Sequence, residues 1–276
     1  MTQHLTRDEL RAVCREVLVW TGMRFDESRR YYVERRVFDR MDALGDQTFG
    51  DYFGRVGRDQ AERERLINAF TVNETYFYRE EHQFACLVND LLPDIASTRR
   101  PGDKIRLWSA PCSTGEEAYS IALWLLENWR MVDAYHVEIV GSDIDTDALD
   151  AAQAGLYGER ALARLPQSVA DAYFEPARRQ RRKIIDDLRE LVTFTQANLI
   201  DAASLQSQGL FDVIFCRNVL IYFDEDARRQ AADNLYDRLA PGGYLCLGHS
   251  EAMARISDRF VTRRFKDATV YQRAAP

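Results

Sequence analysis

Apolar residues in roughly the first eighty positions recur at the spacing of helices. The segment TRDE (residues 6–9) predicts a capping box, in which a threonine and a glutamate satisfy each other's backbone amides. A helical face follows it, made of Leu10, Val13, Val17 and Leu18. A second helix is expected over residues 27–45, with Gly45 as its end and with Val33, Val37, Met41 and Leu44 on one face. Two shorter helices are expected over residues 49–56 and 60–70.

The pattern changes after residues 97–103 (STRRPGD), where strand-length apolar runs begin to alternate with helical stretches. The runs are KIRLWSA (104–110), HVEIVGSDI (136–144), LVTFTQANL (191–199), FDVIFCRN (211–218) and GYLCLGHS (243–250). This alternation predicts a parallel sheet covered by helices on both faces. The last two runs, residues 259–265 and 268–274, are too close for a crossover helix and predict an antiparallel hairpin at the sheet edge. Such an α/β sheet resembles the Rossmann-like methyltransferase fold, although an ordinary doubly wound domain would also fit.

Composition narrows the class of protein. The chain has 276 residues and a net charge of −7, which argues against nucleic acid as its main partner. Its five cysteines form no C-x-x-C pair and its four histidines lack metal-site spacing, so we expect no disulfide framework and no metal. The charged N-terminus does not resemble a signal peptide, and no apolar run approaches the roughly 20 residues of a membrane span. We therefore expect a cytoplasmic protein without membrane insertion.

The loop after the first expected strand, SAPCSTGEEA (109–118), is the first candidate for a ligand site. Small side chains around Gly115 would let the backbone approach a ligand, and ligands of such sheets sit beyond the carboxyl ends of the strands. The next helix starts with Glu116 and Glu117, which would repel the pyrophosphate of a dinucleotide but suit the cationic S-adenosylmethionine (SAM). The two glutamates could equally just complement the helix dipole, so this loop leaves the choice open.

Polar residues also follow the later strands. Asp143 is placed to accept hydrogen bonds from ribose hydroxyls, whereas Asp145 has the simpler interpretation of a helix N-cap. Asn198 would reach an adenine edge, or it is a turn asparagine. In FCRNVLIYFD (215–224), Arg217, Asn218 and Tyr222 lie where a strand meets solvent. Upstream, NETYFYRE (73–80) is either part of the site or a helix junction with core aromatics.

Taken together, these segments resemble the chemotaxis receptor methyltransferase family (CheR) over nearly the whole chain. The matching motifs, in the family's order, are NETYFYRE, STGEEAYSIA, SDIDTDAL, NL, FCRNVLIYFD and GHSE. The resemblance implies an N-terminal helical domain (1–85) and a SAM-dependent methyltransferase domain (86–276) that carries a small inserted β-subdomain in residues 155–195. It also implies esterification of glutamates on the cytoplasmic helical bundle of methyl-accepting chemotaxis receptors.

Roles follow from the resemblance by position. The cofactor pocket would be lined by Asn73, Thr75, Arg79, Glu117, Asp143, Asn198, Leu199, Arg217 and Asn218. Glu117 would hold the methionine amino group and Asp143 the ribose, while Arg79 and Tyr222 would flank the transfer point as catalytic residues. Tyr78 stands where the family has a phenylalanine and would bring a hydroxyl near the cofactor. Cys112 either makes the loop sensitive to thiol reagents or is a small filler residue.

Substrate recognition is expected from arginines on the second helix. Arg29, Arg36 and Arg40 flank its apolar face, either as a solvated flank or, given the resemblance, as a docking surface for the acidic receptor bundle. Family members that bind a receptor's C-terminal tether peptide resemble one another in a glycine-containing insertion. This chain has no glycine between Gly158 and Gly209, which predicts recognition without a tether. We expect a monomer.

The chemistry expected from the resemblance needs no general base. A glutamate with a pKa of about 4.3 is already ionised at neutral pH. Positioning and exclusion of water are then the main tasks, with Arg79 gripping a carboxylate and Tyr222 donating a hydrogen bond. The rival functions are a SAM enzyme acting on nucleic acid or a small molecule, and a non-catalytic module that binds the cofactor or a nucleotide.

Overall fold

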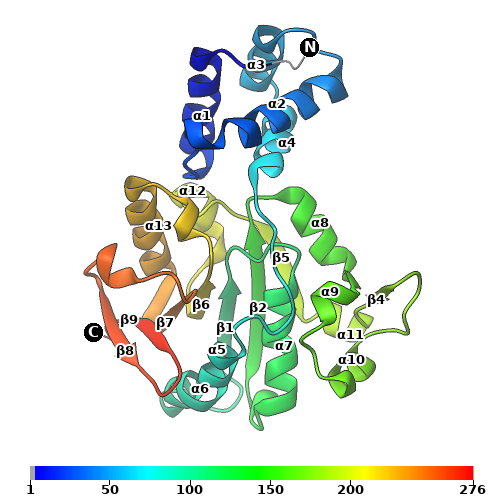
Figure 1. Ribbon diagram of the computed structural model, residues 1–276. Coiled ribbons are helices and arrows are strands. Elements are labelled where there is room, and N and C mark those ends of the chain that lie inside the picture. Colours follow the sequence, from blue (N-terminus) through cyan, green and yellow to red (C-terminus); the bar gives the residue numbers. More distant parts are fainter. Residues whose placement is uncertain (1–3, 276) are drawn as a thin grey trace.

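The computed structural model describes residues 4–275. A helical unit at the N-terminal end stands above a large α/β unit (Figure 1). Its elements are α1 (Arg7–Thr21), η1 (Glu27–Arg29), α2 (Arg30–Leu44), α3 (Phe49–Arg58) and α4 (Gln60–Phe70). Every helix in the described range is too short or too polar to cross a membrane.

Local sequence signals set the ends of these helices. The predicted capping box at α1 is confirmed, with Thr6 accepting from the Glu9 amide and Glu9 accepting from the Thr6 amide at 2.7 Å. Gly45 ends α2 in a left-handed conformation, as predicted. The buried face of α1 consists of Leu10, Val13, Val17 and Thr21, whereas Leu18 is only half-buried.

A seven-stranded sheet forms the centre of the α/β unit. Its strands are β1 (Lys104–Ser109), β2 (His136–Asp143), β5 (Val192–Gln196), β6 (Phe211–Cys216), β7 (Leu239–Leu247), β8 (Phe260–Arg264) and β9 (Thr269–Arg273). Their order is β5-β2-β1-β6-β7-β9-β8. The first five run parallel, β9 pairs antiparallel with β7, and β8 pairs antiparallel with β9. The predicted parallel sheet with a terminal antiparallel hairpin is confirmed.

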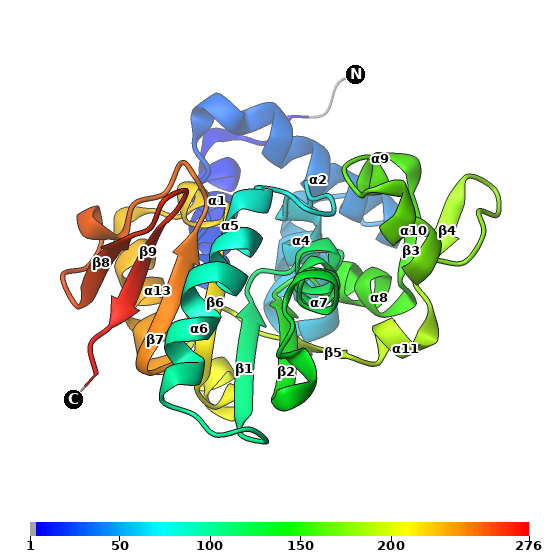
Figure 2. The same ribbon diagram turned by 90° about the horizontal axis from the view of Figure 1, so that it is seen from below.

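Helices cover both faces of this sheet (Figure 2). They are α5 (Glu81–Cys86), the π-helix η2 (Leu87–Leu91), α6 (Leu92–Ser97), α7 (Glu116–Asn128), η3 (Val132–Ala134), α8 (Thr146–Ala154), α12 (Ala202–Leu205), η4 (Gln206–Gln208), η5 (Leu220–Tyr222), α13 (Glu225–Arg238) and η6 (Met253–Arg255). Alternate residues of a strand enter opposite cores because side chains alternate across a sheet. Leu107 joins the core that contains α5 and α7, whereas Trp108 joins the core shared with the N-terminal helices.

A small subdomain lies between β2 and β5 in the chain. It contains β3 (Leu156–Gly158), α9 (Glu159–Leu162), α10 (Gln167–Tyr173), β4 (Arg181–Lys183) and α11 (Asp186–Arg189). Strands β3 and β4 form a separate antiparallel pair beside the main sheet (Figure 2). The turn before β4 places Arg179 and Gln180 at positive φ, 50° and 62°, without a glycine.

The two units are joined by packing and by backbone hydrogen bonds. Phe77, Tyr78 and Phe84 lie in the α5–α7 core, so residues 73–85 pack with the α/β unit and not with the helices we grouped them with. The helical unit itself ends with α4 at Phe70. At the other contact, Arg24 donates its backbone N–H to the Tyr222 carbonyl at 2.9 Å. This pairing fixes the η5 segment against the end of α1.

Candidate active site

Two adjoining pockets open at the carboxyl ends of β1, β2 and β6. They share Val72, Pro111, Ser113, Asn218 and Tyr222 as lining residues. The first pocket, which we call the polar pocket, includes Thr75, Arg79, Glu117 and Arg217. The second, which we call the apolar pocket, includes Asn73, Asp143, Asn198 and Leu199. The fold therefore brings all ten residues that we expected in the cofactor and transfer site around these two adjoining pockets.

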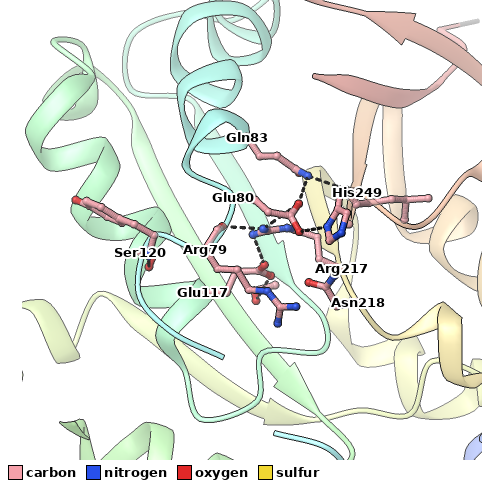
Figure 3. Close-up of polar contacts among 12 residues, drawn as sticks. Arg79, Glu80, Gln83, Glu117, Ser120, Arg217, Asn218 and His249 are labelled. Carbon is pink, nitrogen blue, oxygen red and sulfur yellow. Dashed lines mark hydrogen bonds and ion pairs between the residues drawn. The ribbon is translucent and has the colours of Figure 1, made fainter. Parts of the chain in front are cut away.

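Glu117 and Arg217 both line the polar pocket and contact each other (Figure 3). Arg217 donates from Nη1 to Glu117 Oε2 at 2.7 Å, and the Ser109 hydroxyl donates to Oε1 at 2.7 Å. Burial raises the pKa of Glu117, while the neighbouring Arg217 acts in the opposite direction. The carboxylate lies in the first turn of α7, where negative charge is favoured by the helix dipole.

Arg217 also ties the pocket to the segment before α5. Its Nη2 donates to the Arg79 carbonyl at 2.7 Å and lies 3.2 Å from Glu80 Oε2. The Arg217 side chain is only 2% exposed. Its Nε is buried and has no partner within residues 4–275, so one donor of this guanidinium is left over for a ligand.

Behind Arg217 lies a second group of polar residues that was not predicted from the sequence. Glu80 accepts from Gln83 Nε2 at 2.9 Å and contacts His249 Nδ1 at 3.0 Å (Figure 3). Burial alone would raise the pKa of Glu80, but Arg217 and His249 outweigh it and lower the pKa. Glu80 lies in the motif NETYFYRE and His249 in the motif GHSE. Their place in these motifs was the signal that could have identified them as site residues.

Glu251, the last residue of GHSE, was also missed. Its Oε2 accepts the backbone N–H groups of Asn218 and Gly248 at 2.8 and 2.9 Å. Its Oε1 accepts those of Val219 and Leu220 at 3.0 and 2.8 Å. One carboxylate thus holds together the loops that follow β6 and β7, and it supports Asn218 at a positive φ of 60°.

Asp143 lies at the end of β2 in the apolar pocket. Its Oδ2 accepts the Ser113 amide at 2.8 Å and its Oδ1 accepts the Asp145 amide at 3.0 Å. Burial raises the pKa of Asp143 to about 6. The N-cap interpretation of Asp145 is confirmed, because its side chain accepts the Ala148 amide at 3.0 Å. Asp145 also accepts from Asn73 Nδ2 at 2.7 Å, which anchors the interdomain segment.

Asn198 lines the apolar pocket, but its amide is partly engaged by the protein. Its Nδ2 donates to the Trp20 carbonyl at 2.8 Å, and its Oδ1 accepts the Ile200 amide at 3.2 Å. An amide side chain offers two protons and two lone pairs, so one of each remains. The structure thus gives Asn198 a contact to the end of α1 that the sequence did not indicate.

Arg79 and Tyr222 lie on different walls of the polar pocket. Arg79 donates from Nη1 to the Glu74 carbonyl at 2.6 Å, and its guanidinium lies 5.9 Å from the centre of the Tyr76 ring. Tyr222 belongs to both pockets and is half-buried. Its backbone position is set by Arg24, so the end of α1 supports the wall on which this hydroxyl stands.

Near the site, the expectation for Tyr78 is wrong, and for Cys112 the structure favours one of the two alternatives. Tyr78 is 6% exposed and packs edge-on against Trp124 at 5.0 Å, away from both pockets. Its hydroxyl is therefore part of the core, and burial raises its pKa. Cys112 is 1% exposed, and burial raises its thiol pKa well above the usual value, so the filler interpretation fits better than a reactive thiol.

The three arginines proposed for docking differ in their exposure and in their contacts within the protein. Arg40 forms two hydrogen bonds, of 2.9 and 2.6 Å, with the buried carboxylate of Glu62. Arg36 donates to the Ala69 carbonyl and stacks 3.2 Å over the Tyr32 ring. Arg40 is thereby held by α4, and Arg36 by α4 and by Tyr32 of α2. Of the three arginines, only Arg29 is exposed. Docking of a receptor on these three arginines stays a prediction, in which Arg29 is the most accessible member.

The two pockets fit SAM better than a dinucleotide. Glu117 can accept from an ammonium group, the spare Arg217 Nε can donate to a carboxylate, and Asp143 can accept from ribose hydroxyls. Gly115 lacks a side chain for packing reasons, since a Cβ there would lie 2.9 Å from Ala152 Cβ. The start of α7 already carries the Glu117 carboxylate, which disfavours a pyrophosphate. Among residues 4–275, no group of three or more His, Cys, Asp or Glu could hold a metal ion.

Comparison with known families agrees with this fit. A family model described as "CheR methyltransferase, SAM binding domain" matches residues 73–268. The fold, the site and this match define a methyltransferase that uses SAM. A second model, "CheR methyltransferase, all-alpha domain", matches residues 8–71. The chain belongs to the CheR methyltransferase family.

Relatives match over nearly their whole length. Chemotaxis protein methyltransferase 2 of Vibrio cholerae is 48% identical over 254 residues, which cover 91% of this chain and 88% of the relative. Chemotaxis protein methyltransferase 1 of the same organism is 34% identical and covers 97% of this chain and 98% of its own. Chemotaxis protein methyltransferase 2 of Pseudomonas aeruginosa is 36% identical, with 92% and 90% covered.

Proposed function

We propose that the protein transfers a methyl group from SAM to glutamate side chains of methyl-accepting chemotaxis receptors, for adaptation in chemosensory signalling. The observation that carries this proposal is that the polar and apolar pockets adjoin each other and share Tyr222 and Asn218 as lining residues. A charged amino-acid end and a nucleoside end can be bound there side by side. The names of the relatives, all chemotaxis protein methyltransferases, support the choice of receptor.

When bound, SAM supplies a methyl group carried on a cationic sulfur. Glu117 accepts from the amino group of the methionine end, and Arg217 Nε donates to its carboxylate. Asp143 accepts from the ribose hydroxyls, as its place at the end of β2 favours. The remaining lining residues of this cofactor site are Asn73, Thr75, Arg79, Asn198, Leu199 and Asn218.

The acceptor glutamate needs orientation more than activation. Its carboxylate is ionised at neutral pH, so no base has to remove a proton. Arg79 pairs with a carboxylate at the mouth of the polar pocket, and Tyr222 donates a hydrogen bond to the oxygen that is not methylated. Arg79→Ala and Tyr222→Phe should each lower turnover at least tenfold while SAM affinity for Tyr222→Phe stays within twofold. Normal turnover in both variants would remove these two roles.

The direct test uses radiolabelled SAM and a purified cytoplasmic fragment of a receptor from the same organism. Label should appear on the fragment and be released by mild base, because carboxyl esters hydrolyse and N-methyl groups do not. A receptor fragment with its target glutamates changed to alanine is the matched control. Base-stable label, or label on nucleic acid or a small molecule instead, would contradict the proposal; so would SAM binding without any transfer.

The partner and setting follow from the same proposal. The protein acts in the cytoplasm as a monomer, on the helical bundle of the receptor and without a tether peptide. The absence of glycine between Gly158 and Gly209, a stretch in which Arg179 and Gln180 make the turn, supports tether independence. Light scattering should give the mass of one chain. A receptor tail peptide should show no saturable binding by calorimetry, and a micromolar affinity would contradict this part of the proposal.

A further inference from the structure

Glu80 lies behind the polar pocket without lining it. Its side chain is 11% exposed, and it borders neither the polar nor the apolar pocket. Its Oε2 accepts from Gln83 Nε2 at 2.9 Å and lies 3.2 Å from Arg217 Nη2 (Figure 3). Its Oε1 contacts His249 Nδ1 at 3.0 Å. Both oxygens are therefore engaged within the protein, and Glu80 can act on a bound ligand only through a neighbour.

The backbone before α5 brings two acceptors to Arg217. Its Nη2 donates to the Arg79 carbonyl at 2.7 Å and meets the carboxylate of the next residue, Glu80. Glu80 stands at φ 57° and ψ 54°, in the left-handed region that residues other than glycine rarely adopt. Gln83 fixes this carboxylate to the sheet, because its Nε2 also donates to the Leu247 carbonyl at 2.7 Å. An unfavourable backbone conformation that is held by several contacts is typical of a functional position.

Arg217 divides its guanidinium between two carboxylates. Its Nη1 donates to Glu117 Oε2 at 2.7 Å, and its Nη2 faces Glu80. Although burial raises the pKa of Glu80, Arg217 and His249 outweigh burial and hold that pKa below its usual value, so the carboxylate is charged at neutral pH. A guanidinium often binds one carboxylate through two parallel N–H groups. Glu80 competes for Arg217 and so keeps this arginine from closing onto Glu117 in that way.

This division leaves free the groups that an amino-acid end needs. Arg217 Nε is buried and unpartnered within residues 4–275, and it can donate to a carboxylate. Glu117 Oε2 takes one N–H from Arg217 and Oε1 takes the Ser109 hydroxyl, so each oxygen keeps a lone pair for an ammonium group. We infer that Glu80 is a positioning residue for the methionine end of SAM: it holds Arg217 so that Arg217 and Glu117 can bind that end together. The inference rests on the cofactor site of the proposed function and not on the receptor.

The test compares two ligands that share a nucleoside and differ at the methionine end. S-adenosylhomocysteine (SAH) keeps the charged amino-acid end, whereas 5′-methylthioadenosine lacks it. Calorimetry measures their affinities for the full-length protein, with displacement titrations for weak binding. Glu80→Gln removes the charge at nearly constant volume, and His249→Ala removes an exposed contact of Glu80. Glu81→Gln is the matched control, because Glu81 is the exposed neighbouring residue in the first turn of α5.

Glu80→Gln should bind SAH at least tenfold more weakly, because Arg217 can then pair with Glu117 through two N–H groups. Its affinity for 5′-methylthioadenosine should stay within twofold, whereas a general loss of structure would lower both affinities. His249→Ala should weaken SAH binding at least threefold, again without effect on 5′-methylthioadenosine, and it decides the matter if Glu80→Gln does not fold. Glu81→Gln should bind both ligands as the wild type does.

A double variant shows whether Glu80 acts through Arg217. In the Arg217→Ala background, Glu80→Gln should change SAH affinity by less than twofold, because the residue that it positions is gone. Three results would each overturn the inference. They are normal SAH affinity in both Glu80→Gln and His249→Ala, an equal loss of both ligands in Glu80→Gln, and a further tenfold loss of SAH affinity in the double variant.

The receptor assay separates this inference from the proposed function. If Glu80→Gln loses SAH selectively but the wild type forms no base-labile ester on the receptor fragment, the role of Glu80 stands and the proposed function fails. If the wild type forms the ester and Glu80→Gln binds SAH normally, the proposed function stands and the role of Glu80 fails. An absence of SAH binding by the wild type would overturn both.

Discussion

Arg217 and Glu117 lie 100 residues apart in the chain and meet at 2.7 Å between the end of β6 and the start of α7. The guanidinium is 2% exposed and the carboxylate side chain 13%. Arg217 also lies 3.2 Å from Glu80, so a single guanidinium contacts two largely buried carboxylates. Removing one partner of a buried ion pair leaves an uncompensated charge.

Arg217→Ala should therefore lower the free energy of unfolding by about 3–5 kcal/mol. It should also weaken SAM binding at least tenfold, because Glu117 loses its orientation. Urea denaturation and calorimetry measure the two effects. The matched control is Arg178→Ala on the exposed hairpin, for which we expect a change within about 0.5 kcal/mol. A loss below about 1 kcal/mol for Arg217→Ala would contradict the role of this arginine.

Asp143 should make SAM binding depend on pH. Its carboxylate accepts more strongly from ribose hydroxyls when it is ionised, and burial raises its pKa to about 6. SAM affinity should thus fall as the pH drops below about 6, and binding near pH 6 should release a proton. Calorimetry in buffers of different ionisation enthalpy measures that proton. Asp143→Asn should bind SAM weakly at every pH, without a change in affinity near pH 6.

The same group affects stability with a defined sign. Because the folded pKa of about 6 lies above the usual 3.8, the folded state binds more protons than the unfolded state between these values. The contribution of Asp143 to stability is therefore greatest below about pH 4 and decreases as the pH rises to about 6. In Asp143→Asn this dependence of stability on pH should be absent. An unchanged dependence would show that another group titrates in this range.

Glu251 should act by positioning the loops that carry Asn218 and Tyr222. Glu251→Ala removes the acceptor of four backbone amides, and we expect a loss of about 2–4 kcal/mol in the free energy of unfolding. Turnover should fall more than tenfold, whereas Glu251→Gln, which keeps one acceptor oxygen, should lie between. Glu225→Ala, in an exposed ion pair, serves as the control. Equal turnover in Glu251→Ala and Glu225→Ala would show that the four hydrogen bonds of Glu251 have no effect on the site.

Arg40 should matter for stability and not for receptor affinity. Arg40→Ala leaves the 1% exposed Glu62 carboxylate without its main partner, and we expect a loss of about 3–5 kcal/mol in the helical unit. Arg29→Ala should change stability by less than about 0.5 kcal/mol and weaken receptor binding instead. Thermal melts and surface plasmon resonance separate the two variants. The opposite pattern would restore Arg40 to a docking role.

The cysteines should react in the order of their exposure. Cys14 is half-buried, whereas Cys86, Cys112, Cys216 and Cys246 are buried. An alkylating reagent should label Cys14 first in the native protein, and the other four only after unfolding, as mass spectrometry of digested peptides would show. Fast labelling of Cys112 that is blocked by SAM would contradict the filler interpretation.

Local interactions could be predicted from the sequence because their partners lie within a few residues of each other in the chain. The Thr6–Glu9 capping box, the Gly45 helix end and the Asp145 N-cap all act over three or four positions. The strands and the terminal hairpin followed from hydrophobic runs and short connections. The motifs also located the lining residues of both pockets, since parallel strands place their carboxyl ends at one edge of the sheet.

Side-chain partners far apart in the chain were decided only by the tertiary structure. Asn198 contacts the carbonyl of Trp20, 178 positions away, and Arg40 is held by Glu62 on another helix. A sequence does not indicate whether a charged or polar residue faces solvent or a buried partner. Its role depends on which opposite charge or free amide the fold brings within about 3 Å, and that is a property of packing. The sequence thus determined the elements and the motifs, while the fold determined which arginines were left free to meet a partner.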